Sequence, residues 1–167
     1  GEAFVYGYNT DILGCIIERV SGLSLDRFFA TRLFRPLGMV DTHFFLPPDK
    51  GSRLATVYRW AEGALTRADT GARGQGHYLT GPRTSFAGGA GLVSTARDYA
   101  RFLQMLAAGG RLGGVRILSP TTVRLMTANL AGTLFSPDGL GFVLGFQTVE
   151  RPGGGGSPQA IGSFGWG

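Results

Sequence analysis

The sequence contains few of the residues on which nucleophilic, acid–base and metal chemistry most often depend. Its 167 residues include one cysteine, two histidines and one lysine. A single cysteine cannot form an internal disulfide bond, and Cys15, set in an apolar run, is expected to be a small buried hydrophobic residue. His43 and His77 stand alone in the sequence, with no cysteine near them. The sequence therefore predicts no metal site and implies no cofactor.

Long apolar runs and dense charge clusters are also missing. No run approaches the roughly 18 apolar residues that a membrane-spanning helix needs, and the chain begins at Gly1 without a leader pattern. The formal net charge is +5, but the 16 basic residues are scattered singly. We therefore expect a solvated basic surface, with neither a nucleic-acid partner nor a membrane span. These features do not assign a compartment.

Several catalytic motifs are absent as well. The nucleophile elbow Gly-x-Ser-x-Gly occurs nowhere. A Ser-x-x-Lys pair cannot exist, because the residue three before Lys50, the only lysine, is Pro47. Neither histidine has a spacing that supports a serine triad. The cluster Gly88–Gly91 could hold an anion on free amides, but a tight turn packed under neighbouring chain is the favoured interpretation.

Hydrophobic periodicity and capping signals predict the helices. At 43% hydrophobic and 16% charged residues, the chain can bury a core, and its length favours one domain. Asn9 or Thr10 is expected to cap the first helix, and Ser24 the second. Thr95 with Asp98 forms a capping box, and Ser119-Pro120 is a strong helix start. Helices are accordingly expected over residues 9–20, 24–37, 95–109 and 119–130.

The strand signals are weaker and lie mainly toward the C-terminus. Residues 42–46 are expected to form a short strand, and residues 57–60 a strand or a turn. Residues 68–84, rich in glycine, arginine and threonine, are expected to be a long loop. Residues 141–149 predict a strand whose antiparallel partner is residues 160–166, joined through the glycine run.

Four segments, in order, carry a family resemblance. They are Tyr6-Gly7-Tyr8 with Asp11–Gly14 and Ile17–Gly22, then Arg35–Met39 with Asp41-Thr42, then Gly88–Tyr99, and last Gly162–Gly167. Together they resemble serine beta-lactamase-related proteins, with class C beta-lactamases and family VIII carboxylesterases as the nearest match. The resemblance implies an α+β, beta-lactamase/transpeptidase-like fold with helices packed on an antiparallel sheet. It also implies that residues 1–167 form a single partial domain, incomplete at both ends.

The resemblance also implies roles for individual residues. In the family, a Ser-x-x-Lys serine forms an acyl-enzyme and a tyrosine works beside the lysine; that tyrosine aligns with Tyr6. Trp166-Gly167 matches the start of the Trp-x-Gly motif of esterase-like members. Tyr8, Asn9, Trp166 and Gly167 are therefore expected to contact substrate. The nucleophile is not in this chain, so the chain alone is expected to be inactive.

Elementary chemistry explains how Tyr6 could act. A phenol has an unperturbed pKa near 10 and needs a nearby positive charge to serve as a base at neutral pH. So assisted, it could take the proton of the nucleophile and return one to the leaving group. The alternative is an ordinary buried aromatic with its hydroxyl bonded to backbone. For Asn9, a helix cap remains an equal alternative, and for Trp166 a plain half-buried strand residue.

The function that follows is serine hydrolysis of a small-molecule ester or amide. Because Tyr8 stands where lactamases carry asparagine, the sequence favours a carboxylic esterase. A beta-lactamase or a D-alanyl-D-alanine carboxypeptidase remains an alternative on the same fold. A non-catalytic module that binds a peptide or an acyl group is the alternative from another class.

Overall fold

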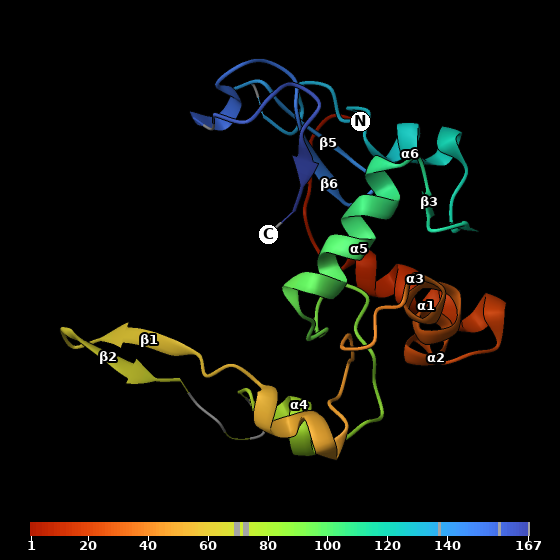
Figure 1. Cartoon of the computed structure of the whole chain (residues 1–167). Coiled ribbons are helices and arrows are strands. Elements are labelled where there is room, and N and C mark those ends of the chain that lie inside the picture. Colours follow the sequence, from red (N-terminus) through yellow and green to blue (C-terminus); the bar gives the residue numbers. More distant parts are fainter. Residues whose placement is uncertain (69–70, 72–73, 137, 157, 167) are drawn as a thin grey trace. The chain divides into compact units, whose positions relative to one another are not determined.

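The structure is a computed structural model, and it describes residues 1–68, 71, 74–136, 138–156 and 158–166. The chain divides into two compact units (Figure 1), and each is described by itself. One unit, here called the helical unit, comprises residues 8–101. The other, here called the sheet unit, joins residues 1–7 to residues 102–167.

The first helix of the helical unit is α1, Asn9–Ser21. It ends as predicted at Gly22, whose φ of 69° places it in the left-handed region, and the N–H of Gly22 donates to Glu18 O at 3.0 Å. The predicted cap is wrong. Tyr8 occupies the N-cap position without a side-chain hydrogen bond, and Asn9 is already helical.

The second predicted helix is continuous but contains an unexpected π-helical turn. It consists of α2 (Leu25–Phe29), the π-segment η1 (Ala30–Phe34) and α3 (Arg35–Leu37). Leu25 and Leu37 are fully buried, and the N–H of Leu25 donates to Glu18 Oε1 of α1 at 2.8 Å. The two helical segments therefore pack as neighbours, as the short link between them predicts.

The Gly88 backbone packs directly on α1. A Cβ atom at Gly88 would overlap with the carbonyl oxygen of Thr10, and one at Gly14 would lie 3.3 Å from Gly88 Cα. The N–H of Gly89 donates to Asp11 Oδ1 at 3.3 Å. In this structure the glycine cluster is a close-packed turn, the favoured of its two sequence interpretations.

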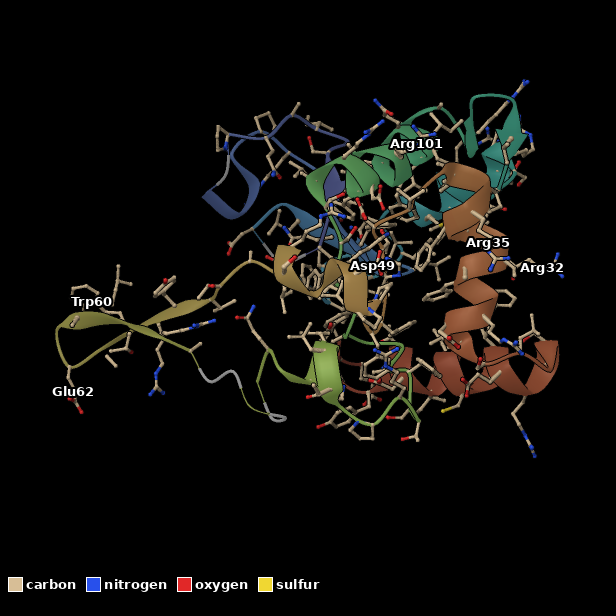
Figure 2. The ribbon with its side chains drawn as sticks, turned by 60° about the horizontal axis from the view of Figure 1, so that its bottom comes forward. Arg32, Arg35, Asp49, Trp60, Glu62 and Arg101 are labelled. Carbon is tan, nitrogen blue, oxygen red and sulfur yellow. The ribbon has the colours of Figure 1, made fainter. Side chains whose placement is uncertain are left out.

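The segment after α3 contains less strand than the sequence predicts. Residues 42–46 form no strand; a single bridge pairs His43 with Val93, because hydrogen bonds to helix ends and side chains occupy the neighbouring backbone. A short 3₁₀ helix, η2 (Pro48–Arg53), follows. Strands β1 (Tyr58–Ala61) and β2 (Ala64–Arg67) form a hairpin, on which Trp60 and Glu62 are labelled in Figure 2. The predicted loop 68–84 contains helix α4 (His77–Thr80).

Helix α5, Ala96–Ala107, begins in the helical unit and ends in the sheet unit. Its start follows the predicted capping signal, since the hydroxyl oxygen of Thr95 accepts the N–H of Asp98 at 3.2 Å. The carboxylate of Asp98 bonds instead to the chain around residue 42, 56 positions away in sequence.

The sheet unit contains a helix, a short hairpin and a three-stranded antiparallel sheet. Helix α6 (Pro120–Met126) is capped by Ser119, whose Oγ accepts the N–H of Thr122 at 3.0 Å, but it ends four residues before the predicted Leu130. The predicted strand 141–149 is a hairpin that turns at Leu144-Gly145. The remaining elements are β3 (Arg111–Leu112), β4 (Val115–Arg116), β5 (Leu140–Val143), β6 (Phe146–Val149), the 3₁₀ segment η3 (Gly154–Gly156) and β7 (Phe164–Gly165).

The register of the sheet confirms the predicted C-terminal partner. The strand order is β5-β6-β7, with Gln147 opposite Gly165 and Thr148 opposite Phe164. The sheet unit buries Met105, Leu106, Val123, Val143, Phe146 and Val149.

The apolar face of α1 lies at the surface. Ile12, Leu13, Ile16 and Val20, which recur at helical spacing, each expose half or more of their area. Cys15 is exposed too, so the prediction that it is buried is wrong. Helical spacing correctly predicts that these apolar residues share one face of α1, but it does not predict whether that face is buried.

Candidate active site

Tyr6 and Trp166 contact each other although 160 positions separate them in the sequence. Tyr6 lies in the segment before α1, and Trp166 directly follows β7. Their ring centroids are 5.3 Å apart with a tilt of 38° between the planes. The indole Nε1–H donates to the Tyr6 hydroxyl oxygen at 3.2 Å. Both residues belong to the sheet unit.

Three phenylalanine rings surround the indole side of this pair. The Phe142 centroid lies 5.1 Å from that of Trp166 at 85°, and the Phe135 centroid lies 6.4 Å away at 61°. Phe4 packs against both phenylalanines at 5.0 Å. Such edge-to-face arrangements are the favoured geometry of aromatic pairs. We call Phe4, Phe135, Phe142 and Trp166 the aromatic cluster.

The Tyr6 side chain is 60% exposed, and its hydroxyl is bonded to an indole rather than to backbone. The alternative of an ordinary buried tyrosine is therefore wrong. Trp166 is 43% exposed and lies just beyond the strand. Tyr8 and Asn9 are exposed at the start of α1 in the helical unit, and Gly167 lies outside the described residues. The expected substrate contacts of these four residues, and the expected role of Tyr6, stay predictions.

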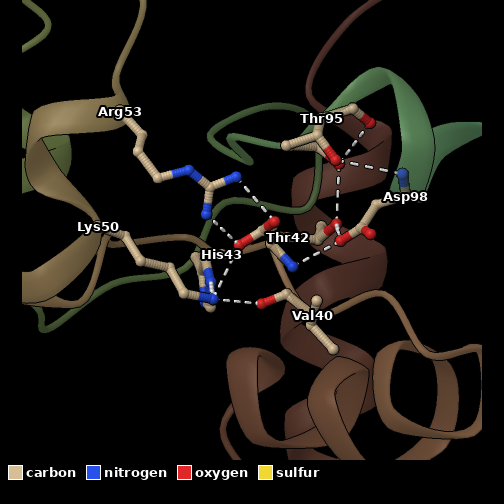
Figure 3. A network of polar contacts seen from close by, with 9 residues as sticks. Val40, Thr42, His43, Lys50, Arg53, Thr95 and Asp98 are labelled. Atoms are coloured by element: carbon tan, nitrogen blue, oxygen red, sulfur yellow. Dashed lines mark hydrogen bonds and ion pairs between the residues drawn. The ribbon is translucent and has the colours of Figure 1, made fainter.

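A second polar centre lies within the helical unit (Figure 3), and sequence analysis missed it. Asp41 accepts two hydrogen bonds from Arg53, at 2.6 and 2.8 Å, and an ion pair from Lys50 at 2.9 Å. Arg53 and Lys50 together hold the pKa of the Asp41 carboxyl well below its usual range. The two cations lie three residues apart on η2, so a single turn of that helix brings both to one carboxylate.

The same centre continues to helix α5 through Asp98. Asp98 is 2% exposed, and its Oδ2 accepts the N–H of Asp41 at 2.6 Å and the hydroxyl of Thr42 at 3.0 Å. The hydroxyls of Thr42 and Ser94 share a hydrogen bond of 2.8 Å. We call these residues, with Lys50 and Arg53, the Asp41–Asp98 network.

His43 borders the network. Its Nε2 lies 3.4 Å from Lys50 Nζ. Burial, and then the positive charge of Lys50, lower the pKa of the imidazole. Because an ammonium can only donate, the neutral ring accepts at this nitrogen. The arrangement favours an uncharged His43 in the folded chain.

A cavity of about 260 Å³ adjoins the network. It is lined by Asp41, Leu46, Lys50, Arg53, Leu54, Ala55, Val57, Gln75, Val93, Ser94 and Thr95. The side-chain amide of Gln75 fixes one wall, since it accepts the N–H of Val57 at 3.0 Å and donates to Ala55 O at 2.7 Å. Asp41 and Asp98 lie in two segments of the family resemblance, but their spacing does not predict that they meet. The cationic partners of Asp41 come from η2, a helix that periodicity does not predict.

The described residues contain neither a metal-binding cluster nor a membrane-spanning helix. No group of three or more His, Cys, Asp or Glu side chains among them could hold a metal ion. No helix within the described ranges is long and apolar enough to cross a membrane.

Comparison with known proteins identifies the family. The beta-lactamase family model matches residues 1–167, and the chain belongs to that family. Its fold is of the beta-lactamase/transpeptidase type: the chain is similar to EstCE1, a hydrolase with promiscuous acyltransferase activity, with a TM-score of 0.77 and 27% identity over 96% of this chain and 44% of that one.

Curated relatives point to hydrolases. An uncharacterized protein of Mycobacterium tuberculosis is 42% identical over 75% of this chain and 30% of its own length. Lovastatin esterase of Penicillium rubens is 34% identical over 74% of the chain and 30% of the esterase. A D-alanyl-D-alanine carboxypeptidase-like protein of Escherichia coli O157:H7 is 29% identical over 93% of the chain and 38% of that protein. The chain thus spans about a third of the length of these relatives, and the names of the esterase and of the carboxypeptidase-like protein support a hydrolase.

Proposed function

We propose that the protein to which this chain belongs hydrolyses carboxylic esters through a serine acyl-enzyme, with Tyr6 as the proton relay. The observation that carries the proposal is the contact between Tyr6 and Trp166, residues from two motifs of the family resemblance. Among the described residues, the Tyr6 hydroxyl has the Trp166 indole as its one hydrogen-bond partner, and the exposed phenol is free to meet a reacting group on its other side. The nucleophile and its lysine come from a Ser-x-x-Lys segment, which this chain does not contain.

In the proposed reaction, Tyr6 accepts and returns one proton in each of the two steps, acylation and deacylation. In the phenolate form, which the lysine ammonium favours, Tyr6 Oη accepts the proton of the serine hydroxyl as its oxygen attacks the ester carbonyl carbon. Collapse of the tetrahedral intermediate breaks the ester C–O bond, and Tyr6 returns that proton to the departing alcohol. Water then attacks the acyl-enzyme and gives one proton to Tyr6. Collapse of this second tetrahedral intermediate breaks the acyl C–Oγ bond, and Tyr6 returns the proton to the serine oxygen, which releases the carboxylic acid and regenerates both the serine hydroxyl and the phenolate.

The C-terminal strand supplies the other wall in this proposal. Backbone N–H groups near Gly165 and Trp166 could stabilise the oxyanion, as edge-strand amides do in acyl transfer. The indole of Trp166 offers an apolar surface to the acyl group. Two relatives support an ester substrate, since one is named an esterase and another a hydrolase with acyltransferase activity.

The test uses the longer protein that joins this chain to a Ser-x-x-Lys segment. Tyr6→Phe should abolish turnover of a short-chain nitrophenyl ester and leave the thermal melt nearly unchanged, because the hydroxyl is largely exposed. Tyr58→Phe, at a similarly exposed tyrosine of strand β1 outside the candidate site, serves as the matched control and should retain turnover. The 167-residue chain alone should show none. Turnover retained by Tyr6→Phe would refute the relay.

A peptidase or lactamase activity is the second candidate, favoured by the carboxypeptidase-like relative. Tyr8 stands where lactamases carry asparagine, so a chromogenic cephalosporin should be hydrolysed far more slowly than the ester. Equal efficiencies toward both substrates would overturn the esterase preference. Binding of an acyl ligand with no turnover, in the presence of an intact Ser-x-x-Lys segment, would instead identify a binding module.

A further inference from the structure

We propose that Trp166 is a positioning residue for Tyr6: its indole N–H orients the Tyr6 oxygen and stabilises the charge that this oxygen carries during proton transfer. The inference rests on the proposed function and deepens it. It assigns Trp166 a role beyond a wall for the acyl group.

The direction of the hydrogen bond follows from chemistry. An indole Nε1–H can only donate, so the oxygen of Tyr6 is the acceptor in the 3.2 Å contact. In the phenolate form that takes the proton of the nucleophile, the Tyr6 oxygen carries no proton and has more than one lone pair. The indole occupies one lone pair and leaves another to accept the proton of the nucleophile and then return it to the leaving group. A proton relay needs this division.

The aromatic cluster holds the indole in place. Phe142 on β5 and Phe135 meet the Trp166 ring edge-to-face, and Phe4 packs on both. Phe4 lies two residues before Tyr6, so its packing against Phe135 and Phe142 also anchors the segment that carries Tyr6. The three phenylalanine rings of the cluster therefore help to position both the indole donor and its acceptor, and little reorganisation is needed when a proton moves to or from the oxygen.

The donor is neutral and does not titrate. A lysine at this position would add a charge and an ionisation of its own, whereas an indole N–H donates over the whole working pH range. Histidine at position 166 would restore a ring N–H and bring an ionisation near pH 6.5. This difference gives a signature that a purely structural role of Trp166 does not predict.

The first test uses the longer protein, labelled with ¹⁵N. The given sequence contributes two tryptophans to it, Trp166 and the 71% exposed Trp60, and Trp60→Phe assigns the indole N–H signal of the second. Tyr6→Phe should shift the Trp166 indole signal, assigned by Trp166→Phe, and leave that of Trp60 in place. If neither signal moves, the hydrogen bond is not formed and the inference is wrong.

The second test measures kinetics in the longer protein. Trp166→Phe keeps an aromatic ring but removes the N–H, and it should lower kcat by roughly tenfold with little change in KM, the scale of one hydrogen bond. Trp166→His should recover part of kcat and add a pH dependence near 6.5.

The outcomes separate this inference from the proposed function. Loss of turnover in Tyr6→Phe together with unchanged kcat in Trp166→Phe would overturn the positioning role and leave the relay intact. A raised KM with unchanged kcat would also overturn it, because Trp166 would then be a wall for substrate only. Turnover retained by Tyr6→Phe would refute the proposed function itself.

Discussion

Replacement of the buried Asp98 by alanine should destabilise the helical unit more than replacement of an exposed carboxylate such as Asp49. The Asp98 carboxylate is buried at the start of α5, and its Oδ2 accepts the N–H of Asp41 at 2.6 Å and the Thr42 hydroxyl at 3.0 Å. It therefore ties helix α5 to the segment 41–42, and through Asp41 to both cations of η2.

The expected loss can be built from these contacts. A hydrogen bond to a charged acceptor contributes about 1.5 to 3 kcal/mol. The Asp41 N–H loses its acceptor in the variant, whereas the Thr42 hydroxyl keeps Ser94 at 2.8 Å and should lose nearer to about 1 kcal/mol. The release of a buried charge offsets a part of this sum. Asp98→Ala should therefore lower the free energy of unfolding by about 3 kcal/mol.

Urea-induced unfolding followed by far-UV circular dichroism would measure this loss. Asp98→Asn keeps one acceptor oxygen and should lose roughly half as much. Asp49→Ala, on the exposed side of η2 (Figure 2), is the matched control and should stay within about 0.5 kcal/mol of the parent. An Asp98→Ala variant as stable as the Asp49→Ala variant would refute the assignment of the network as a structural tie.

Three further perturbations follow from the helical unit. Burial and the Lys50 charge lower the pKa of His43 below its usual value of 6.5, so the unfolded chain binds a proton more readily than the folded one. The free energy of unfolding should therefore fall as the pH drops through 6.5. His43→Gln should flatten this pH dependence, and His77→Gln should leave it unchanged. Gly88→Ala should destabilise by about 1 to 3 kcal/mol through overlap with α1, whereas Gly165→Ala meets open space and should cost much less. Glu62, at a φ of 53° in the β1–β2 turn, is strained, and Glu62→Asn should slow amide exchange across the hairpin several-fold.

A specific result would contradict each of these three predictions. A His43→Gln variant with the pH dependence of the parent would show that another group sets it. Equal stability losses for the two alanine variants would show that the close approach of Gly88 to α1 is not formed in solution. Unchanged or faster amide exchange in Glu62→Asn would show that the turn is not strained.

Local sequence signals predicted the helices well and the strands poorly. Gly22 and Thr95 bound α1 and α5 as expected, because a left-handed glycine and a capping hydroxyl act on their own turn. Strand 141–149 is instead a hairpin, since an apolar run does not reveal that Gly145 turns the chain at a φ of 89°. The strand predicted over residues 42–46 does not form, because the backbone of this segment and of its neighbour Asp41 is bonded to side chains from distant segments.

The candidate site was predictable only where a motif carries the chemistry. The resemblance located Tyr6 and Trp166, and the structure brings their side chains together. The Asp41–Asp98 network was not predictable, because none of its bonds joins residues at a spacing that a helix or strand imposes. Its longest link joins positions 57 residues apart.

The aromatic cluster shows why motif residues can be found from sequence while their alignment cannot. The indole reaches Tyr6 because Phe4, from the N-terminal segment, packs against Phe135 and Phe142 of the sheet unit, and these rings hold Trp166. None of the phenylalanines belongs to a catalytic motif, so each could be exchanged for another apolar residue without altering the resemblance. Phe4→Ala should therefore weaken the contact of Tyr6 with Trp166 while both motif residues remain. Its measure is the Trp166 indole N–H signal, which should move toward that of the Tyr6→Phe variant; an unmoved signal would mean that the two motifs meet without the help of the cluster.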